Sequence, residues 1–437
     1  MFSDAISKQV VSASLILLVI AVMAPPAAGA RGPKSGALAI HPTNPYYFQD
    51  SSGNPLWLVG NSMNCFSDYN YDYITYFNTL QAKGLNFSRT WVSKERECLD
   101  TSGSVVFYFA FQRPGPGTAQ DGKLKCDLTK YNASFFTRLR AVCQAAKDRG
   151  IFLQLIFLDA WNNKRTDRFI VSAYNVLNNI NGVDADVNND GDAIDDGEFF
   201  STSNTGVYNT QKAFIAKVID ETNQYDNILY EIANENAYSA SWDQALCDYA
   251  QSYEAGKPKQ HLVMPEQMPN HGYGDIKTFT LSQLHKNLLN ARSLGQPLIW
   301  CTDGEGQPDD ATVRKAMYSV YVSGGHADYD GTSFTTDQML YLKTFAYSCK
   351  FWEMTPSNSL VTSGGAYAMA SNKEMAAYFY NGGTATLNLT KLKGKLSARW
   401  YNPLDGKFGE AFKVQGGGQV EFKAPGEGDW ALLVKRS

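Results

Sequence analysis

Short apolar segments alternate along most of this chain with segments in which apolar residues recur every three or four positions. The apolar segments predict β-strands at 56–59, 85–91, 151–158, 228–230, 261–264, 275–281 and 296–302. The periodic segments predict helices at 73–83, 135–148, 208–223, 242–254, 283–293, 311–322 and 337–353. Because such strands are apolar on both faces, we expect them in a parallel sheet covered by helices. With an eighth strand inferred at the loop 324–328, this order predicts an α/β fold, a (β/α)8 TIM barrel over 31–356.

The pattern changes to a period of two after Pro356. Strands are predicted at 374–380, 384–389, 396–401, 419–422 and 430–434, with glycine-rich turns between them. Alternation of this kind is typical of antiparallel sheets with one buried face. Residues 357–437 are therefore expected to form a small antiparallel β-sandwich domain after the barrel.

The first 30 residues have the pattern of a secretory signal peptide. Lys8 precedes an apolar run from Val10 to Ala24, and Ala28-Gly29-Ala30 offers a small-x-small cleavage site. A membrane anchor is the alternative, but a run of about 15 residues is shorter than the roughly 20 that span a bilayer. We therefore expect residues 1–30 to be removed. The mature protein would be extracellular or periplasmic, with no membrane partner.

Charge and composition narrow the choice of partner. The 437 residues carry a formal net charge of −4 at a pI near 5.8, which argues against nucleic acid or an anionic membrane surface. Aromatic residues are abundant, with 25 Tyr, 24 Phe and 8 Trp. Sugar rings present apolar C–H faces, so such side chains suit a carbohydrate site, although most are expected to fill the core.

The seven cysteines follow no metal-binding spacing, so a zinc site is not expected. Their odd number leaves at least one unpaired in an exported chain. Cys65 and Cys98 both follow predicted strands and could pair above the barrel. The alternative is that all seven are buried thiols.

An acidic segment inside the predicted barrel matches the start of a calcium loop of EF-hand type. Oxygen-bearing residues hold its first, third, fifth and seventh positions, namely Asp186, Asn188, Asp190 and Asp192, with Gly191 at the sixth. The twelfth position holds Gly197 instead of a bidentate Glu, and Glu198 comes next. The segment predicts either a structural calcium site or a solvated acidic loop. No cofactor is expected to be required for activity.

Carboxylates and amides at strand ends are the candidate chemistry. Barrel enzymes place catalytic groups there, and glycosidic bonds are cleaved by two carboxyl groups. Glu235, after the fourth strand, is the candidate general acid/base, and Asn234 beside it could hold the sugar 2-hydroxyl. Asp303 and Glu305, after the seventh strand, are the candidate nucleophiles; we favour Glu305 for its longer reach. In a retaining enzyme the two carboxyls should lie about 5 to 5.5 Å apart.

Five further residues are candidates for binding substrate. Arg89 on the second strand could hold the nucleophile ionised through a charge-assisted hydrogen bond. The residues expected to line the cleft are Trp91, Asp159, Trp161 and His326. For each of these four the alternative is packing or an exposed loop position.

Three segments resemble clan A of the glycoside hydrolases: Gly84-Leu85-Asn86-Phe87-Ser88-Arg89, Asn234-Glu235, and Pro297-Leu298-Ile299-Trp300 with the acid that follows. The resemblance implies a (β/α)8 barrel and a retaining double displacement, with the acid/base after strand four and the nucleophile after strand seven. The chain departs from clan A at Thr302-Asp303-Gly304-Glu305, where Glu lies further from the strand than usual.

A closer resemblance is to the apiosidase-like barrel glycosidases. It lies in Asp127-Leu128-Thr129-Lys130-Tyr131, Phe136-Thr137-Arg138-Leu139 and Tyr230-Glu231-Ile232-Ala233-Asn234-Glu235. Those proteins carry a C-terminal domain labelled collagen-binding, and its signature is similar to Trp400-Tyr401-Asn402-Pro403-Leu404-Asp405-Gly406. The label is a name, and nothing in these residues supports collagen as the ligand.

The sequence therefore predicts a secreted, monomeric, retaining glycoside hydrolase that acts on a plant, algal or microbial polysaccharide or oligosaccharide. The alternative is a non-catalytic carbohydrate-binding protein on the same scaffold. The substitution Glu235→Gln distinguishes the two, because the enzyme would lose turnover and keep binding. The sugar and its linkage depend on loop shape, which sequence patterns do not specify.

Overall fold

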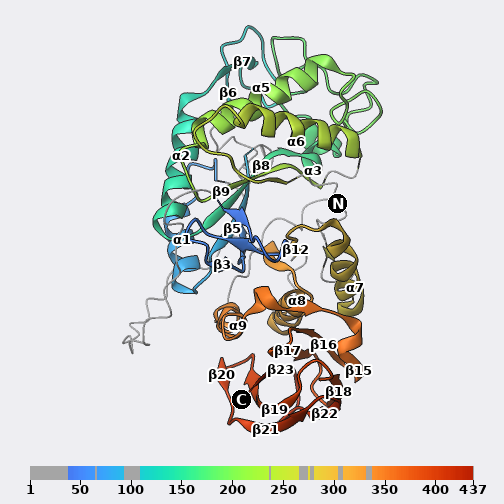
Figure 1. The fold of residues 1–437 in the computed structure, drawn as a ribbon. Helices are drawn as coiled ribbons and strands as arrows, with labels where there is room; N and C mark the ends of the chain where they lie inside the picture. Colours follow the sequence, from blue (N-terminus) through green and yellow to red (C-terminus); the bar gives the residue numbers. More distant parts are fainter. Residues whose placement is uncertain are drawn as a thin grey trace.

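The computed structural model describes residues 38–63, 66–92, 109–235, 238–264, 274–275, 280–303, 309–330 and 337–436. Helices surround a parallel sheet in the larger part of the chain, and antiparallel strands form the end that holds the C-terminus (Figure 1). The predicted signal peptide, Cys65, Cys98 and Glu305 lie outside the described residues.

Eight strands form one parallel sheet in the order β10-β9-β8-β5-β4-β13-β12-β11. They are β4 (Val59–Met63), β5 (Phe87–Trp91), β8 (Phe152–Asp159), β9 (Ile228–Asn234), β10 (Val263–Met264), β11 (Gly274–Asp275), β12 (Ile299–Asp303) and β13 (His326–Asp330). β13 pairs with β4, so the last strand of the sheet lies beside the first, as in a barrel. The prediction of an α/β fold with a parallel sheet is confirmed. Closure into an eightfold barrel stays a prediction, because the chain between β10 and β11 runs through residues outside the described ranges.

Helices alternate with these strands. They are α1 (Tyr73–Ala82), α2 (Ala133–Asp148), α5 (Thr205–Thr222), α6 (Ala240–Glu254), α7 (Leu281–Ala291), α8 (Asp310–Val322) and α9 (Gln338–Ala346). Polar N-caps start most of them; at α7, for example, Thr280 and Gln283 form a capping box. Periodicity therefore located these helices correctly, although α9 is shorter than predicted and a 3-10 turn at Phe351–Glu353 follows it.

Three short N-terminal strands cover the amino end of the parallel sheet: β1 (Ala39–Ile40), β2 (Phe48–Gln49) and β3 (Pro55–Leu56). Their apolar side chains join the first residues of the parallel strands in one buried cluster, formed by Leu38, Phe48, Leu56, Leu58, Phe87, Phe152, Leu229 and Ile299. The amino end is thus closed by packing, and the polar side chains of the site lie toward the carboxyl end.

Two antiparallel sheets form the C-terminal part (Figure 1). One has the order β14-β16-β17-β23-β19-β20 with β21 also paired to β19, and the other has the order β15-β18-β22. The strands are β14 (Thr355–Pro356), β15 (Val361–Gly364), β16 (Ala366–Ala370), β17 (Glu374–Phe379), β18 (Thr384–Asn388), β19 (Gly394–Asn402), β20 (Lys407–Phe408), β21 (Phe412–Gly416), β22 (Gln419–Lys423) and β23 (Trp430–Arg436). Their shared core joins Phe379 and Leu396 of the first sheet to Leu387 and Phe422 of the second. The predicted antiparallel region is confirmed.

Helices α8 and α9 pack on the larger antiparallel sheet, so the two parts share buried residues. Tyr318 of α8 stacks on Tyr378 of β17 with ring centroids 5.0 Å apart, and Phe345 of α9 packs on Tyr401 of β19 at 5.3 Å. Gly406 fits against Tyr341 of α9, where an added Cβ would lie 2.4 Å from the ring.

A buried ion pair crosses the same interface. Arg314 of α8 bonds Asp429 through Nε, at 2.9 Å from Oδ2, and through Nη2, at 2.6 Å from Oδ1. The Tyr378 hydroxyl donates to Asp429 Oδ2 at 2.7 Å, and Arg314 Nη1 donates to Gln338 at 3.0 Å. Both charged groups are therefore bonded within the interface itself.

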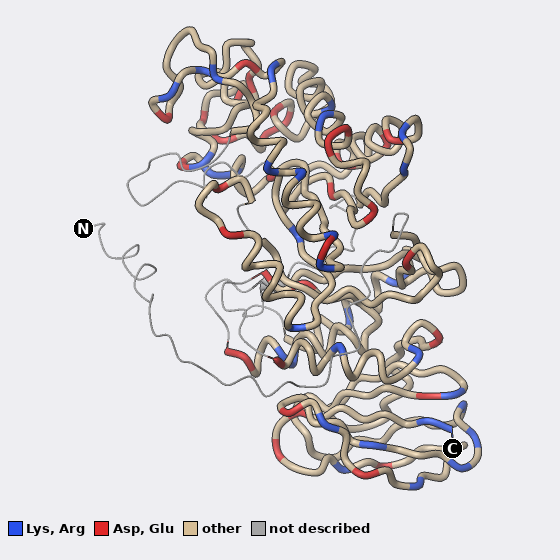
Figure 2. The backbone as a smooth tube through the Cα atoms, turned by 90° about the vertical axis from the view of Figure 1, so that its left-hand side faces the viewer, with Lys and Arg blue, Asp and Glu red and all other residues tan. Residues whose placement is uncertain are grey.

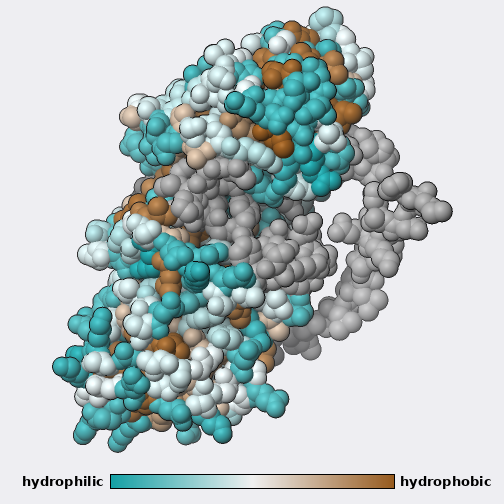
Figure 3. Space-filling model, turned by 90° about the vertical axis from the view of Figure 1, so that its right-hand side faces the viewer, coloured by the Kyte–Doolittle hydropathy of each residue, from teal (hydrophilic) through white to brown (hydrophobic). Residues whose placement is uncertain are grey.

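Charged residues of both signs are spread over the two parts of the chain (Figure 2). On the face drawn in Figure 3, hydrophobic surface occurs as small areas among hydrophilic ones. Within the ranges that the structure describes, every helix is too short or too polar to cross a bilayer.

Candidate active site

The centre of the candidate site is a buried pair between Arg89 of β5 and Glu231 of β9. Arg89 Nε donates to Glu231 Oε2 at 2.8 Å, and Arg89 Nη2 bonds the other carboxylate oxygen. Gln154, on β8 between them, donates to Oε2 at 2.6 Å. Such two-pronged contacts fix the plane of both groups. The predicted contact of Arg89 with the nucleophile stays a prediction, because Glu305 and the Asp303 side chain lie outside the described residues.

Asn234, the last residue of β9, joins this pair to a second carboxylate. Its Oδ1 accepts from Arg89 Nη2 at 3.1 Å, and its Nδ2 donates to Asp159 Oδ1 at 3.0 Å. Asp159 ends β8 and caps the short helix α3 (Ala160–Asn163), where the Trp161 N–H donates to it at 3.3 Å. Asp159 was expected to line the cleft, but it is only 1% exposed. Its carboxylate holds Asn234 and the start of α3 in place.

Glu235 follows directly and leaves the sheet in an unusual backbone conformation. Its φ is +53°, in the left-handed region, which costs a residue with a Cβ roughly 1–2 kcal/mol. Its side chain is 31% exposed and its Oε2 lies 2.5 Å from Lys164 Nζ. Strained backbone of this kind concentrates at functional positions.

The two predicted tryptophans are packed against arginines. Trp91, at the end of β5, is 3% exposed, and the Arg89 guanidinium carbon lies 5.2 Å from its ring centroid. Trp161 is partly buried, with the Arg168 guanidinium carbon 3.3 Å from its ring centroid. Trp91 therefore cannot be an exposed sugar platform, and one face of Trp161 is covered.

Tyr238, which was not among the predicted site residues, is more exposed than Trp91 and lies closer in the chain to Glu235. Tyr238, three residues after Glu235, is 37% exposed and packs on Phe200 with ring centroids 5.1 Å apart. Burial raises the pKa of its hydroxyl; the charge of Lys164 lowers it, and those of Asp192 and Glu235 raise it. These charges therefore lie near its hydroxyl. Its position close behind Glu235 in the chain was the available signal.

Asp328 of β13 is a buried residue of the parallel sheet that sequence reasoning missed. It pairs in register with Cys301 and Gly60 and accepts from the Ser62 hydroxyl at 2.7 Å. Burial raises the pKa of this carboxyl to about 6, although the hydrogen bond from Ser62 and the charge of Arg89 oppose the rise. For Glu231 the available signal was a carboxylate within the mostly apolar strand β9, whereas β13 also holds His326 and Asp330 and gave no such signal for Asp328.

The prediction that His326 lines the cleft is wrong. His326 is the first residue of β13 and lies at the amino end of the sheet, opposite Glu235. Its Nδ1 accepts from the Leu58 N–H at 2.9 Å, and Phe48 packs on the ring at 4.7 Å between centroids. Burial lowers the pKa of His326 to about 3, so the ring is neutral and serves packing.

The two candidate nucleophiles remain predictions. Asp303 is the last residue of β12 and pairs in register with Asp330 of β13, which puts its backbone at the carboxyl end of the sheet. Glu305 lies outside the described residues, as does the Asp303 side chain. The expected separation from Glu235 is therefore untested.

The acidic segment forms a loop held by its own backbone. Asp186 accepts from the N–H groups of Asp190 and Gly191, each at 3.0 Å, and buried Glu198 accepts from Asp195 N at 2.9 Å. Burial and neighbouring carboxylates raise the pKa values of Asp192 and Glu198. In the described ranges, no three His, Cys, Asp or Glu side chains are placed to hold a metal ion. Calcium binding by Asp186, Asn188, Asp190 and Asp192 stays a prediction.

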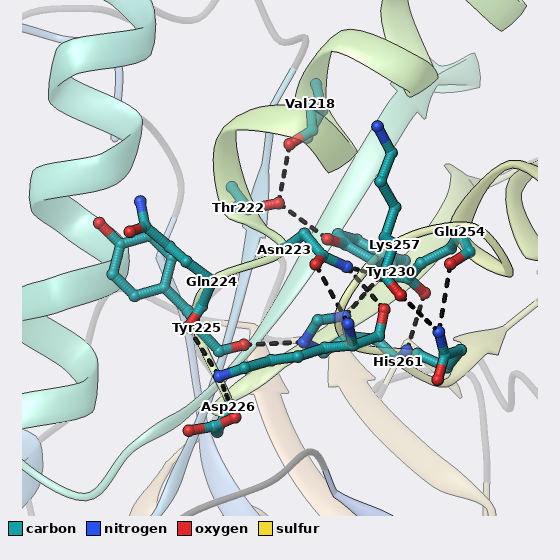
Figure 4. Close-up of polar contacts among 12 residues, drawn as sticks. Val218, Thr222, Asn223, Gln224, Tyr225, Asp226, Tyr230, Glu254, Lys257 and His261 are labelled. Carbon is teal, nitrogen blue, oxygen red and sulfur yellow. Dashed lines mark hydrogen bonds and ion pairs between the residues drawn. The ribbon is translucent and has the colours of Figure 1, made fainter.

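A buried His–Glu contact elsewhere belongs to the framework (Figure 4). His261, before β10, lies with Nδ1 2.6 Å from Glu254 of α6 and with Nε2 2.7 Å from the Tyr225 carbonyl. Asn223, which ends α5, donates to the same Glu254 oxygen at 2.9 Å. These contacts tie α5 and α6 to the amino ends of β9 and β10, away from Glu235.

The cysteines of the described residues are all buried: Cys126, Cys143, Cys247, Cys301 and Cys349. The proposed Cys65–Cys98 pair lies outside these residues and stays a prediction.

Two family models match this chain, one within the part that holds the parallel sheet and one within the antiparallel part. Residues 95–265 match a family described as "Domain of unknown function (DUF6298)", and residues 356–435 match "Putative collagen-binding domain of a collagenase". A search of curated protein sequences gave no match.

Solved structures resemble most of the chain. A structure titled "Glycoside hydrolase" has 14% identity and a TM-score of 0.63, covering 93% of this chain and 98% of its own. A glycoside hydrolase family 5 structure from Bacteroides vulgatus has 15% identity and a TM-score of 0.66, covering 93% and 94%. The chain has the fold of the glycoside hydrolases. Within the glycoside hydrolase fold, Arg89, Asn234 and Glu235 lie at or toward the carboxyl ends of β5 and β9.

Proposed function

We propose that this protein is a secreted retaining glycoside hydrolase in which Glu235 is the general acid/base. One observation carries the proposal: a partly exposed glutamate leaves the carboxyl end of β9 next to an asparagine that two buried charged groups hold. The fold shared with glycoside hydrolases supports it. A barrel closed by all eight strands is part of the proposal, as is removal of a signal peptide after Ala30.

The chemistry requires Glu235 to act twice. In the first step its carboxyl donates a proton to the glycosidic oxygen as that oxygen leaves the anomeric carbon, and Asp303 or Glu305 forms the new bond to this carbon. In the second step the Glu235 carboxylate takes a proton from water, whose oxygen attacks the anomeric carbon and releases the nucleophile. One water is consumed for each bond cleaved. Asn234 would bind the 2-hydroxyl, and Tyr238 would offer its exposed ring to a neighbouring sugar.

The test is a screen of the purified protein against plant, algal and microbial polysaccharides, with Glu235→Gln as the key variant. We expect Glu235→Gln to lower kcat/KM on a natural substrate by about 10²- to 10⁴-fold, the usual contribution of an acid/base, and to retain binding. Glu410→Gln, at an exposed position of the antiparallel region, is the matched control and should keep full activity. Turnover by Glu235→Gln equal to that of the wild type would overturn the proposal.

Two further measurements address the mechanism. The anomer first formed, followed by NMR, should have the configuration of the substrate, as retention requires. Azide should partly restore turnover of an activated glycoside by Glu305→Ala; rescue of Asp303→Ala instead would reverse those two roles. Binding without turnover on every polysaccharide would favour the carbohydrate-binding alternative.

A further inference from the structure

The ion pair between Lys164 and Glu235 has no part in the chemistry described above. Lys164 Nζ lies 2.5 Å from Glu235 Oε2, and the two side chains are 30% and 31% exposed. An acid/base must be protonated in one step and ionised in the next, so a fixed cation at this distance favours one of its two states. We propose that Lys164 is the positioning residue of Glu235, orienting its carboxylate and setting the pH range of catalysis; this inference rests on the proposed function.

The backbone that carries Lys164 is fixed at both ends of α3. At the start, Asp159 caps the helix, and the Asn162 side chain donates to it at 2.7 Å. At the end, the Lys164 N–H donates to Ala160 at 2.9 Å. The Asn163 carbonyl accepts from Ala193 N in the acidic loop, also at 2.9 Å. The backbone from which the Lys164 side chain extends is therefore held on both sides.

The Asp159 carboxylate contacts both the helix that precedes Lys164 and the residue that precedes Glu235. Asp159 caps the helix that ends at Lys164 and also accepts from Asn234, whose neighbour in the chain is Glu235. Relative movement of the lysine and the glutamate would break one of these contacts. The left-handed backbone at Glu235 turns its side chain away from the strand direction, toward α3. Geometry on both sides thus brings the two charges together.

Other charged groups surround the pair. The charges of Lys164, Asp192 and Glu235 all act on the Tyr238 hydroxyl, and Arg89 donates to Asn234 on the other side of the strand end. Arg165 and Arg168 follow Lys164 in the chain, but their guanidinium groups lie over the Trp161 ring.

The experiment compares Lys164→Met and Lys164→Arg with Lys147→Met. Lys147 is a matched control, because it is 31% exposed and pairs with Asp226 at the amino end of the sheet. On a substrate that needs leaving-group protonation, the alkaline limb of kcat/KM should move up by about one pH unit in Lys164→Met, the smaller end of what one opposite charge causes. Lys164→Arg should restore the wild-type limb, and Lys147→Met should leave it unchanged.

A second readout does not need activity. In protein labelled at the glutamate carboxyl carbon, the Glu235 signal, assigned by its loss in Glu235→Gln, should titrate at higher pH in Lys164→Met than in the wild type. Equal titration in both, or an unmoved pH profile with reduced kcat, would overturn the positioning role. If Glu235→Gln keeps full turnover while the Glu235 signal of the Glu235-containing proteins still depends on Lys164, the proposed function fails and the pairing stands.

Discussion

Two buried arginine–carboxylate pairs, Arg89–Glu231 and Arg314–Asp429, share their chemistry and differ in where their hydrogen bonds lead. The side chains are 1% and 0% exposed in the first pair, and 7% and 1% in the second. From Arg314–Asp429 the bonds end at Tyr378 and Gln338 inside the interface. From Arg89 they continue through Asn234 and Asp159 to α3 and the chain at Glu235.

The difference shows how one interaction can serve either stability or function. A buried ion pair gives little net stability, since desolvation offsets the attraction, but removal of one partner leaves an uncompensated charge. Both pairs should therefore be sensitive to single substitutions. The two pairs should differ in their response only when both partners of a pair are replaced. Only the Arg89 pair also orients neighbouring groups of the candidate site.

The largest effect is expected at Arg89. Arg89→Met leaves Glu231 buried without its partner, so unfolding free energy should fall by about 3–5 kcal/mol. Displacement of Asn234 and Glu235 should also lower kcat/KM by at least about 100-fold. In Arg89→Met/Glu231→Met, denaturant unfolding should show stability largely recovered while activity stays lost. Recovery of both would mean that the pair is only structural.

At the interface, Arg314→Met should lower the unfolding free energy by a similar amount, about 3–5 kcal/mol. Here the double variant Arg314→Met/Asp429→Leu should recover most of the stability and have the wild-type kcat/KM at a temperature where it is folded. Reduced activity in this folded double variant would show that the interface also influences the site, and the contrast between the pairs would disappear.

The pH dependence of stability tests the raised pKa of Asp328. The charge of Arg89 lowers this pKa but does not cancel the effect of burial. The folded-state pKa of about 6 for Asp328 lies above the ordinary value of 3.8 for an aspartate. Between these values the folded state keeps a proton that the unfolded state has lost, so stability falls as pH rises through this window and levels off above it. The shift of roughly two units corresponds to about 3 kcal/mol. Urea unfolding at several pH values should show this decline reduced in Asp328→Asn; identical pH slopes would contradict the assignment.

The carboxylates of the acidic loop differ from those of the two arginine pairs, because they accept hydrogen bonds from backbone N–H groups and not from a guanidinium. If calcium binds there, free calcium at 100 times Kd should stabilise the protein by about 2.7 kcal/mol, and chelator should lower Tm. Asp190→Asn should remove this response, whereas Asp405→Asn, in an exposed turn, should keep it. A melting curve unchanged by chelator would leave the acidic-loop interpretation.

Local pattern was enough to locate most of the framework. The helices and the long strands β8, β9 and β12 were predicted because each shows its own period or apolar run. The short strands β15, β20 and β21 were missed, since β15 and β21 bury little. Such strands form through their partners and leave a weak pattern of their own.

The site was predicted less completely, because its contacts join distant segments. Glu231 and Arg89 are 142 residues apart in sequence, and nothing local identifies them as partners. His326 was assigned to the wrong end of the sheet because its strand was inferred from a loop. An error of four or five residues along a strand corresponds to about 15 Å, which is roughly the length of β13. Glu235 and Asn234 were selected as candidates because both lie at the end of a clearly apolar strand.

The left-handed backbone at Glu235 has a consequence for laboratory evolution. Glycine adopts this conformation without the steric penalty, so Glu235→Gly should fold at least as stably as the parent while lacking the carboxyl group. Under the proposed function, a selection for heat resistance alone would therefore enrich inactive sequences at this one position. Any thermostabilisation of this protein needs an activity screen applied in the same round.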